Sequence, residues 1–386
     1  MQIDLDIGMT CYGTNIKGIG GRVRVKNTDF IVDEILEPGI TASVLSMLSS
    51  YIPFRMVKTG IFILEKDNID TITAIELLSR RLRLKPRNIG YAGLKDKRSY
   101  SFQRISIEKA TPINVVRAVT RLKRVRVHYV GEGRRVVVGS NPGNYFKITI
   151  RDVKIPSIEI NNIRFFPNYY GYQRFGYSKP YNHEIGRFLV IKDFKAAVEA
   201  IVKGRGRGYE EKVKECISSK PRDYVGALRR IPKKVLRLYV QSFQSYLFNL
   251  YLSRRLEYSE DLLTPIEGEL EVKIKNLGFE GKSLPSNAPA VRLPGYGYKE
   301  RGTTADKIMG EVMKSQQVKY SDFLIKEIPE VSIYGGVRKI AAVPRIIDVK
   351  EHENDLSIEF CLERGEYASV FLREVMKPEN PVLAGL

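Results

Sequence analysis

Apolar residues recur with two different periods in the first 153 residues, and these periods predict a mixture of strands and helices. Two segments, 71–84 and 113–122, repeat apolar residues every three or four positions, and Asp70 or Thr71 can cap the first helix. Six others alternate apolar and polar positions or hold short apolar runs, as strands do: 21–36, 61–66, 101–107, 126–130, 134–139 and 145–153. This part of the chain is therefore predicted to be α+β.

The pattern changes near residue 165, where an aromatic stretch with glycine and proline begins and runs to about residue 186. The elements predicted beyond this point are helices at 184–203, 234–257, 305–316 and 367–377, short strands between 263 and 300, and a strand at 356–363. Gly365 marks a turn after the last strand, and Pro378 ends the last helix. The aromatic stretch is the clearest candidate for a domain boundary.

The net positive charge of the chain indicates which class of molecule it binds. The chain has 64 Lys and Arg against 44 Asp and Glu, a formal charge of +20 and an isoelectric point near 9.7, which is typical of nucleic-acid binders. A merely soluble basic protein is the alternative. The cations, however, lie beside aromatic or glycine-rich segments such as 121–129, 131–135 and 204–209, which favours phosphate contacts combined with base stacking.

The spacing of cysteines and histidines indicates neither a disulfide framework nor a metal site. No CxxC or HxxxH pair occurs among Cys11, Cys216, Cys361, His128, His183 and His352. No apolar run reaches about 18 residues, and the N-terminal segment is acidic where a signal peptide would be basic. The expectation is a cytoplasmic protein that binds no metal and no membrane.

Glycine-rich segments do not indicate a nucleotide cofactor. The segment 278–283 resembles the end of a Walker A loop, but Asn276 occupies the position of its first glycine. Segments 18–21 and 204–208 lack the dinucleotide-binding spacing, so turns or backbone contacts to RNA are expected there. No histidine lies near a GxSxG elbow either, which removes the usual hydrolase site.

One carboxylate stands out in "GYAGLKDKRSYSFQ", residues 90–103, where Asp96 lies between Lys95 and Lys97. A salt-bridged surface turn and a catalytic aspartate for a polyanionic substrate are both consistent with this pattern. A glycosidase-like pair with Asp29, Asp33 or Glu34 is a third possibility. In a basic chain, however, the glycosidic bond to be attacked is expected to lie within a nucleotide whose base has left the stack.

This segment resembles the signature of the TruD family of pseudouridine synthases, in which the aspartate of the Gly-x-Lys-Asp run is catalytic. Five further segments resemble the family in the same order, so the resemblance covers nearly the whole chain and is closer to archaeal members than to bacterial ones. They are "TDFIVDE" (28–34), "GNYF" (143–146), "PNYYGYQRFG" (167–176), "SFQSYLFN" (242–249) and "LERGEYASVFLREVMK" (362–377).

The resemblance implies isomerisation of a uridine in tRNA, with position 13 as the leading candidate, to pseudouridine without a cofactor; tRNA precursors or other structured RNA are the alternative substrates. The implied fold is α+β, with a catalytic domain containing a mixed, mainly antiparallel sheet and an inserted α+β TRUD domain. We assign residues 1–165 and 341–386 to the catalytic domain and 166–340 to the insertion.

By the same resemblance, Asp96 is the catalytic carboxylate, acting as nucleophile or as general base, and Arg24 is the cation that pairs with it. Lys95 is the local rival for that pairing and is otherwise assigned to substrate binding. Phe30, Phe146 and Tyr367 match the family's aromatic positions, where a flipped uracil would stack, although each alone would be expected in the core.

Asn144 in "GNYF" can donate to and accept from the base or the loop around Asp96. The last motif departs from the family, which more often has Leu-Pro-x-Gly-Ser before the aromatic, whereas here Glu363 follows Leu362 and Glu366 precedes Tyr367. The departure changes the charge of the loop.

Two other functions fit parts of the sequence. A non-catalytic RNA-binding protein or RNA chaperone on the same fold would explain the charge, but RNA binding alone would favour Asn or Lys at the position of Asp96. Another RNA-modifying enzyme, such as a methyltransferase, needs a cofactor loop, and none is recognisable. No obligate protein partner is inferred.

Overall fold

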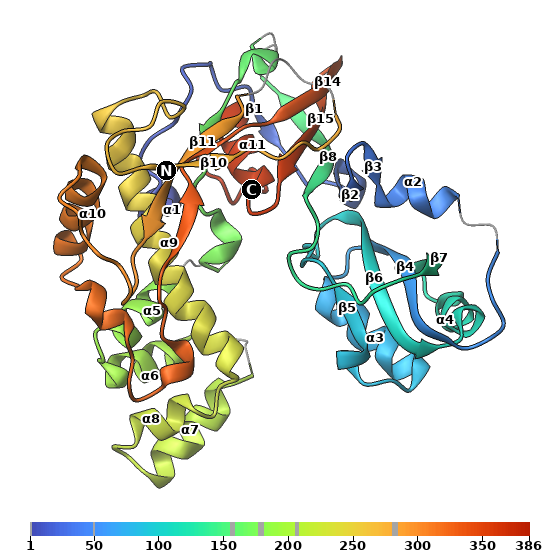
Figure 1. Ribbon diagram of the computed structural model, residues 1–386, viewed down its shortest axis with the longest axis horizontal. Helices are drawn as coiled ribbons and strands as arrows, with labels where there is room; N and C mark the ends of the chain where they lie inside the picture. Colours follow the sequence, from blue (N-terminus) through green and yellow to red (C-terminus); the bar gives the residue numbers. More distant parts are fainter. Residues whose placement is uncertain (1, 49–50, 155–158, 177–180, 205–207, 280–284) are drawn as a thin grey trace.

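The computed structural model describes residues 2–48, 51–154, 159–176, 181–204, 208–279 and 285–386. Within them, ten strands form one sheet whose main path is β14-β15-β8-β2-β6-β4-β7, while β1, β3 and β5 pair with β8, β2 and β6 (Figure 1). Their bounds are β1 Gly20–Arg22, β2 Phe30–Glu37, β3 Ile40–Thr41, β4 Val57–Asp67, β5 Ile89–Tyr91, β6 Tyr100–Ala110, β7 Val125–Glu132, β8 Gly143–Val153, β14 Arg345–His352 and β15 Asp355–Glu363.

The pairing of β2 with β6 is parallel, and the other pairings described in this sheet are antiparallel. The register sets Ile31 opposite Tyr100 on one side of β2 and Glu34 opposite Asn144 on the other. The expected mixed, mainly antiparallel sheet is therefore confirmed. Because β2 lies between β6 and β8, the middle of the sheet joins the two lobes of the molecule seen in Figure 1.

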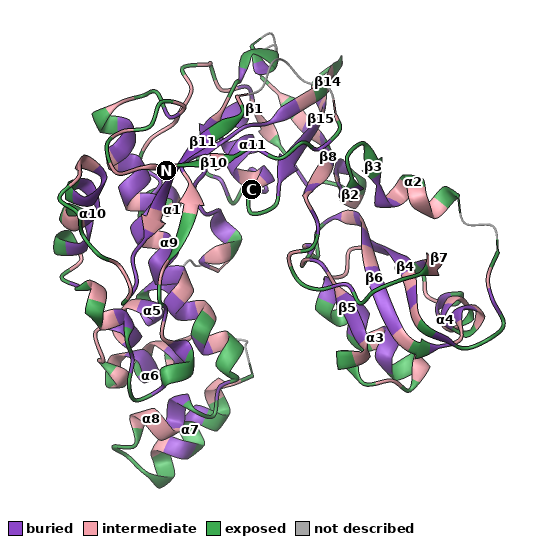
Figure 2. Cartoon of the chain, viewed as in Figure 1, coloured by how far each residue is buried: buried purple, intermediate pink, exposed green. Residues whose placement is uncertain are grey.

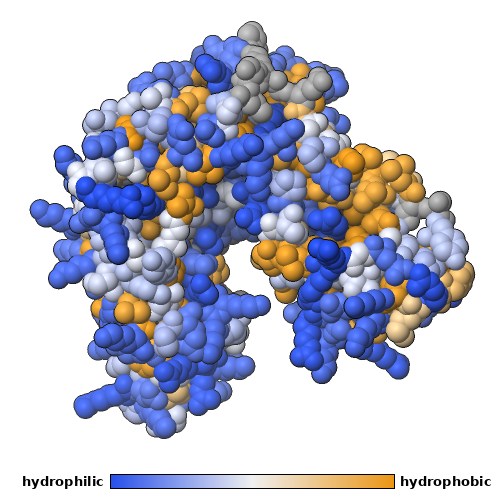
Figure 3. Space-filling model, viewed as in Figure 1, coloured by the Kyte–Doolittle hydropathy of each residue, from blue (hydrophilic) through white to orange (hydrophobic). Residues whose placement is uncertain are grey.

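The smaller lobe packs α3 (Thr71–Leu82) and α4 (Pro112–Val119) against β4, β6 and β7. Asp70 caps α3, because its side chain accepts from the backbone N of Thr73 at 3.0 Å. The buried apolar side chains of this lobe form a separate core, which includes Phe62, Leu64, Ile75, Leu78, Ile105, Ile107, Val115 and Val127. Figure 3 shows further apolar side chains on its surface near α2 (Ala42–Met47), where Met47 is exposed.

The larger lobe is built around α9, which crosses it and is buried along much of its length (Figure 2). Two further small sheets are described there, β10-β11-β12 and β13-β9. The helices are α1 Gln2–Asp6, α5 Asn182–Val190, α6 Phe194–Lys203, α7 Glu210–Ser219, α8 Tyr224–Leu228, α9 Lys233–Tyr258, α10 Thr304–Ser315 and α11 Ala368–Met376. The strands of the two small sheets are β9 Phe166–Pro167, β10 Leu270–Lys273, β11 Asn287–Leu293, β12 Gly336–Lys339 and β13 Ala341–Ala342.

The cores do not follow the predicted domain division. One continuous core joins apolar residues of β2, β8 and β15 to those of α5, α9 and α11, whereas the smaller lobe has its own. The sheet half that carries β8, β14 and β15 thus shares its buried surface with the helices after residue 166. The division at 165 and 341 stays a prediction.

Most predicted elements are confirmed, and three differ from the sequence pattern. Residues 134–139 form no strand, since Val137 and Val138 are 56% and 75% exposed and no neighbouring strand pairs with them. The helix expected at 184–203 is two helices, because Lys192 has a positive φ of 64° and Asp193 caps α6. The strand expected at 21–36 is interrupted between β1 and β2 by a 3₁₀ turn.

Residues 205–207 of the basic glycine-rich segment and residues 280–283 of the Walker-like segment lie outside the described residues. Across the described ranges, no helix combines the length and the apolar character that crossing a membrane requires.

The contact between α5 and α9 depends on Gly186. A Cβ there would lie 2.0 Å from the carbonyl O of Tyr239, so Gly186→Ala should separate the helices and lower the free energy of unfolding by roughly 2–3 kcal/mol. Gly310→Ala on α10 is the matched control, because its Cβ would approach only Glu300 Oε1, at 3.6 Å, and should add about 0.5–1 kcal/mol. Urea denaturation of both variants gives the comparison, and a stable Gly186→Ala would contradict this packing.

Candidate active site

A hollow of about 390 Å³ lies where the two lobes meet. Its wall includes the loop between β5 and β6, the starts of β2 and β8, residues around Gln173, and the turn before α11. The residues predicted from the sequence all line it: Arg24, Phe30, Lys95, Asp96, Asn144, Phe146 and Tyr367. Segments that are far apart in the chain are thus brought to one pocket, because β2 pairs with both β6 and β8.

Asp96 reaches the pocket from a loop, and its side chain is 33% exposed. Its Oδ2 lies 3.4 Å from Nη2 of Arg24, and its Oδ1 accepts a hydrogen bond from Nε2 of Gln173. A donor on each oxygen fixes the plane of the carboxylate while leaving it accessible to a ligand. The arrangement suits a carboxylate that acts on a substrate as nucleophile or base.

Arg24 is held in place before any ligand arrives. Its backbone has a positive φ of 58°, its Nη1 donates to the carbonyl O of Gly385 at 2.5 Å, and its guanidinium carbon lies 3.9 Å from the centroid of the Phe30 ring. Its side chain is only 5% exposed. The ammonium of Lys95 instead donates to Asn144 Oδ1, so among the described residues Arg24 is the cation whose side chain pairs with the carboxylate of Asp96.

A layer of buried charge lies beneath the pocket. Glu34 is fully buried, and neither of its carboxylate oxygens has a hydrogen-bond partner within the described residues. Burial raises the pKa of Glu34 and lowers the pKa of Lys95, while the attraction between the two opposes both shifts. In the same described residues, no three metal-ligating side chains gather to hold an ion.

Lys66 is a site residue that sequence reasoning missed. Its buried Nζ donates to the carbonyl O of Asp96 at 2.8 Å and to that of Ile69 at 2.7 Å. Ser99 Oγ also donates to the carbonyl of Asp96, at 2.9 Å, so the loop that carries Asp96 is held through its backbone. The sequence did contain a signal for this residue. Side chains alternate between the two faces of a strand, so Lys66 lies on the same face as Phe62 and Leu64 and is expected to be buried with them.

Gln173 is the second missed residue. It lies in the 3₁₀ turn Tyr172–Arg174 of the larger lobe, and its contact with Asp96 crosses between the lobes. Nothing in the local pattern distinguishes it from the aromatic and polar residues around it.

The predicted aromatic residues occupy different environments. Phe146 stacks on Phe360 at 5.1 Å and meets the edge of Phe30 at 6.4 Å, so its ring belongs mainly to the core. Tyr367, the N-cap residue of α11, is only partly buried and meets Tyr170 edge-on at 6.2 Å. Tyr367 is therefore the least buried of the three predicted aromatic residues, all of which line the pocket.

Comparisons with known proteins agree with one another. A family model described as tRNA pseudouridine synthase D (TruD) matches residues 6–219 and 205–375. Two archaeal proteins described as probable tRNA pseudouridine synthase D are similar: that of Pyrobaculum islandicum is 33% identical over 99% of this chain and 98% of its own, and that of Pyrococcus furiosus is 29% identical over 96% and 99%. A crystal structure described as that of the "Putative tRNA pseudouridine synthase D (TruD)" from Methanosarcina mazei superposes with a TM-score of 0.74 at 26% identity, covering 99% of both chains.

Lys66 gives the site a pH-dependent stability. Burial lowers its pKa from 10.5 to about 8, so between these values the unfolded chain binds more protons than the folded protein. Relative to Lys66→Met, the wild-type protein should therefore gain free energy of unfolding as the pH rises from about 8 toward 10.5, by roughly 1 kcal/mol per pH unit.

Urea denaturation of both proteins across this range measures the difference. Lys58→Met, at an exposed position on the same strand, is the control. If the difference in free energy of unfolding between the wild-type protein and Lys66→Met did not change with pH, the prediction would be wrong. The buried ammonium would then keep its proton over this range.

Proposed function

This chain belongs to the TruD family of tRNA pseudouridine synthases, and from that membership we propose that its pocket isomerises a uridine of tRNA with Asp96 as the catalytic carboxylate. The observation that carries the proposal is the double contact of Asp96, with Arg24 on one oxygen and Gln173 on the other, inside a hollow that can receive one extruded nucleoside. No cofactor takes part in the proposed reaction.

The reaction is an isomerisation, so the substrate and product contain the same atoms. The N1–C1′ bond breaks, the uracil turns while it stays in the pocket, C5 bonds to C1′, and the proton lost from C5 is balanced by one gained at N1. Asp96 assists either by attacking C1′ or by removing the 2′ proton. Arg24 compensates the charge of the carboxylate and keeps it aimed.

The remaining wall of the pocket holds the base. Tyr367 supplies a stacking face, Phe30 and Phe146 close the apolar side, and Asn144 offers its amide next to Lys95. The charge of +20 supplies the sequence-independent attraction for the phosphates of tRNA. Modification at position 13 and a cytoplasmic location stay predictions.

Asp96→Asn tests the chemistry. The amide keeps the size of the side chain but is neither a nucleophile nor a base, so turnover should fall by roughly a thousandfold or more, about 4 kcal/mol, with tRNA affinity retained. Pseudouridine mapping of total tRNA after incubation measures both reaction and target.

Asp152→Asn, which alters an exposed carboxylate paired with Arg22, is the matched control and should keep full activity. If Asp96→Asn turned over at the wild-type rate, the role of Asp96 would be wrong. A wild-type protein that binds tRNA without modifying it would favour the RNA-binding alternative.

Tyr367 tests the stacking wall. Tyr367→Phe keeps the aromatic face and should be mild, whereas Tyr367→Leu loses a base–aromatic contact of about 1–3 kcal/mol and should be slow. Single-turnover rates at saturating tRNA, with melting temperatures, separate this role from a structural one. If Tyr367→Leu kept the full rate but had a lower melting temperature, Tyr367 would be a structural residue, and Phe30 would become the candidate for stacking on the base.

A further inference from the structure

The turn of residues 363–367 builds one side of the pocket. It joins β15 to α11, and it supplies Arg364, Gly365, Glu366 and Tyr367 to the pocket wall. Within the turn, the backbone N of Glu366 donates to the carbonyl O of Glu363 at 3.2 Å, and that of Glu363 donates to Glu366 Oε2 at 2.9 Å. The position of Tyr367 therefore depends on how the two glutamates are held.

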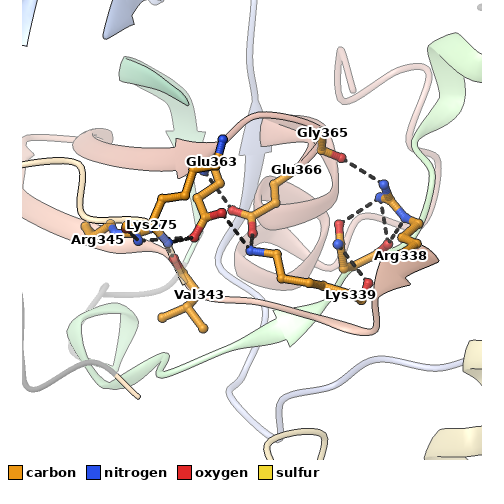
Figure 4. Close-up of polar contacts among 9 residues, drawn as sticks. Lys275, Arg338, Lys339, Val343, Arg345, Glu363, Gly365 and Glu366 are labelled. Atoms are coloured by element: carbon orange, nitrogen blue, oxygen red, sulfur yellow. Dashed lines mark hydrogen bonds and ion pairs between the residues drawn. The ribbon is translucent and has the colours of Figure 1, made fainter. Parts of the chain in front are cut away.

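The two glutamates are bridged by Lys339, at the end of β12 (Figure 4). Its Nζ lies 2.9 Å from Glu363 Oε2 and 3.0 Å from Glu366 Oε1. The side chains of Glu363 and Glu366 are 5% and 1% exposed, and that of Lys339 is 13% exposed. Water can do little to replace the ammonium there, so the geometry of the turn follows the position of this cation.

Of the two glutamates, Glu366 depends more on Lys339 for compensation of its charge. Glu363 has a second cation in Arg345, whose Nη2 lies 3.3 Å away, and it also accepts from the backbone N of Lys275 at 2.9 Å. For Glu366, Lys339 is the cation in contact among the described residues. Burial raises the pKa of Glu366, and the charge of Lys339 opposes that shift.

A second contact from the same strand reaches the turn. Arg338 donates through Nη1 to the carbonyl O of Gly365 at 3.1 Å (Figure 4). Through Nη2 it donates to Asn168 Oδ1 at 2.8 Å. Its guanidinium carbon lies 3.8 Å from the centroid of the Tyr170 ring, the ring that Tyr367 meets edge-on. Strand β12 thus supports both the turn and the aromatic neighbour of Tyr367.

We propose that Lys339 is a positioning residue of the reaction, whose ammonium, by bridging Glu363 and Glu366, fixes the turn 363–367 and so aims Tyr367 at the substrate base. The proposal rests on the proposed function and deepens it. Lys339 is not part of the pocket wall, so it acts through the turn rather than on the substrate. Strand β12 falls within the predicted insertion, which in this way takes part in building the catalytic pocket.

Lys339→Met tests the proposal, because it keeps the stem of the side chain and removes the charge. The single-turnover rate at saturating tRNA should fall by roughly 10–100-fold, with less than about a threefold change in Kd for tRNA, since a displaced wall slows the chemistry more than it weakens phosphate contacts. Lys339→Arg should restore most of the rate. Lys192→Met is the matched control, since it removes a lysine whose Nζ contacts Asp322 away from the pocket, and it should keep the full rate.

A double variant separates positioning from general destabilisation. If Lys339 acts through Tyr367, Lys339→Met combined with Tyr367→Leu should be about as slow as the slower single variant, because both remove the same wall. If Lys339→Met does not fold, Glu366→Gln replaces it: the uncharged isostere loses the ion pair and should slow the rate in the same direction.

The outcomes distinguish the two proposals. Full rate per folded molecule in Lys339→Met or Glu366→Gln, with only a lower melting temperature, overturns the positioning role and leaves the proposed function intact. Independent, multiplicative losses in the double variant overturn it as well. A wild-type protein that forms no pseudouridine in tRNA overturns the proposed function itself.

Discussion

The carboxylate of Asp96 must be held in a fixed orientation and still be reachable, and the rest of the structure depends on that constraint. Two side chains contact its oxygens from different segments, Arg24 before β2 and Gln173 in the larger lobe. Lys66 and Ser99 donate hydrogen bonds to the backbone carbonyl of the same residue. With side chain and backbone both fixed, the proposed binding of a nucleoside in the pocket requires little reorganisation.

This arrangement requires buried charge, which is costly. Lys66 and Glu34 are fully buried, and Lys95, Glu363 and Glu366 nearly so. Each unpaired member would be destabilising, whereas a paired one adds little stability over an apolar residue. Buried ion pairs also lie away from the pocket, such as Arg255 with Glu269 and Arg373 with Asp4. Beside the pocket, the buried charge is better explained by the geometry that it imposes than by a contribution to stability.

The position of the pocket follows from the sheet. The parallel pairing of β2 with β6 and its antiparallel pairing with β8, in which Val32 lies opposite Phe146, bring both strands beside the loop that carries Asp96. The larger lobe then closes the pocket through Gln173 and the turn before α11. Because β2, β8 and β15 share one core with α9, the half of the sheet that meets the larger lobe is packed against it as one unit.

The sequence by itself determined most of the local elements and indicated the residues that gather at one pocket. Hydrophobic period predicted most strands and helices, since period depends only on neighbouring residues, and the motif resemblance indicated seven residues that line one pocket. Tertiary structure decided what local pattern does not encode. Val137 and Val138 lie in a segment that was expected to be a strand, but they stay exposed because no described strand pairs with them. Gln173 and Lys339 gain their contacts with Asp96 and Glu366 from register and packing between segments 77 and 27 residues apart, and those are set only when the whole sheet and its helices assemble.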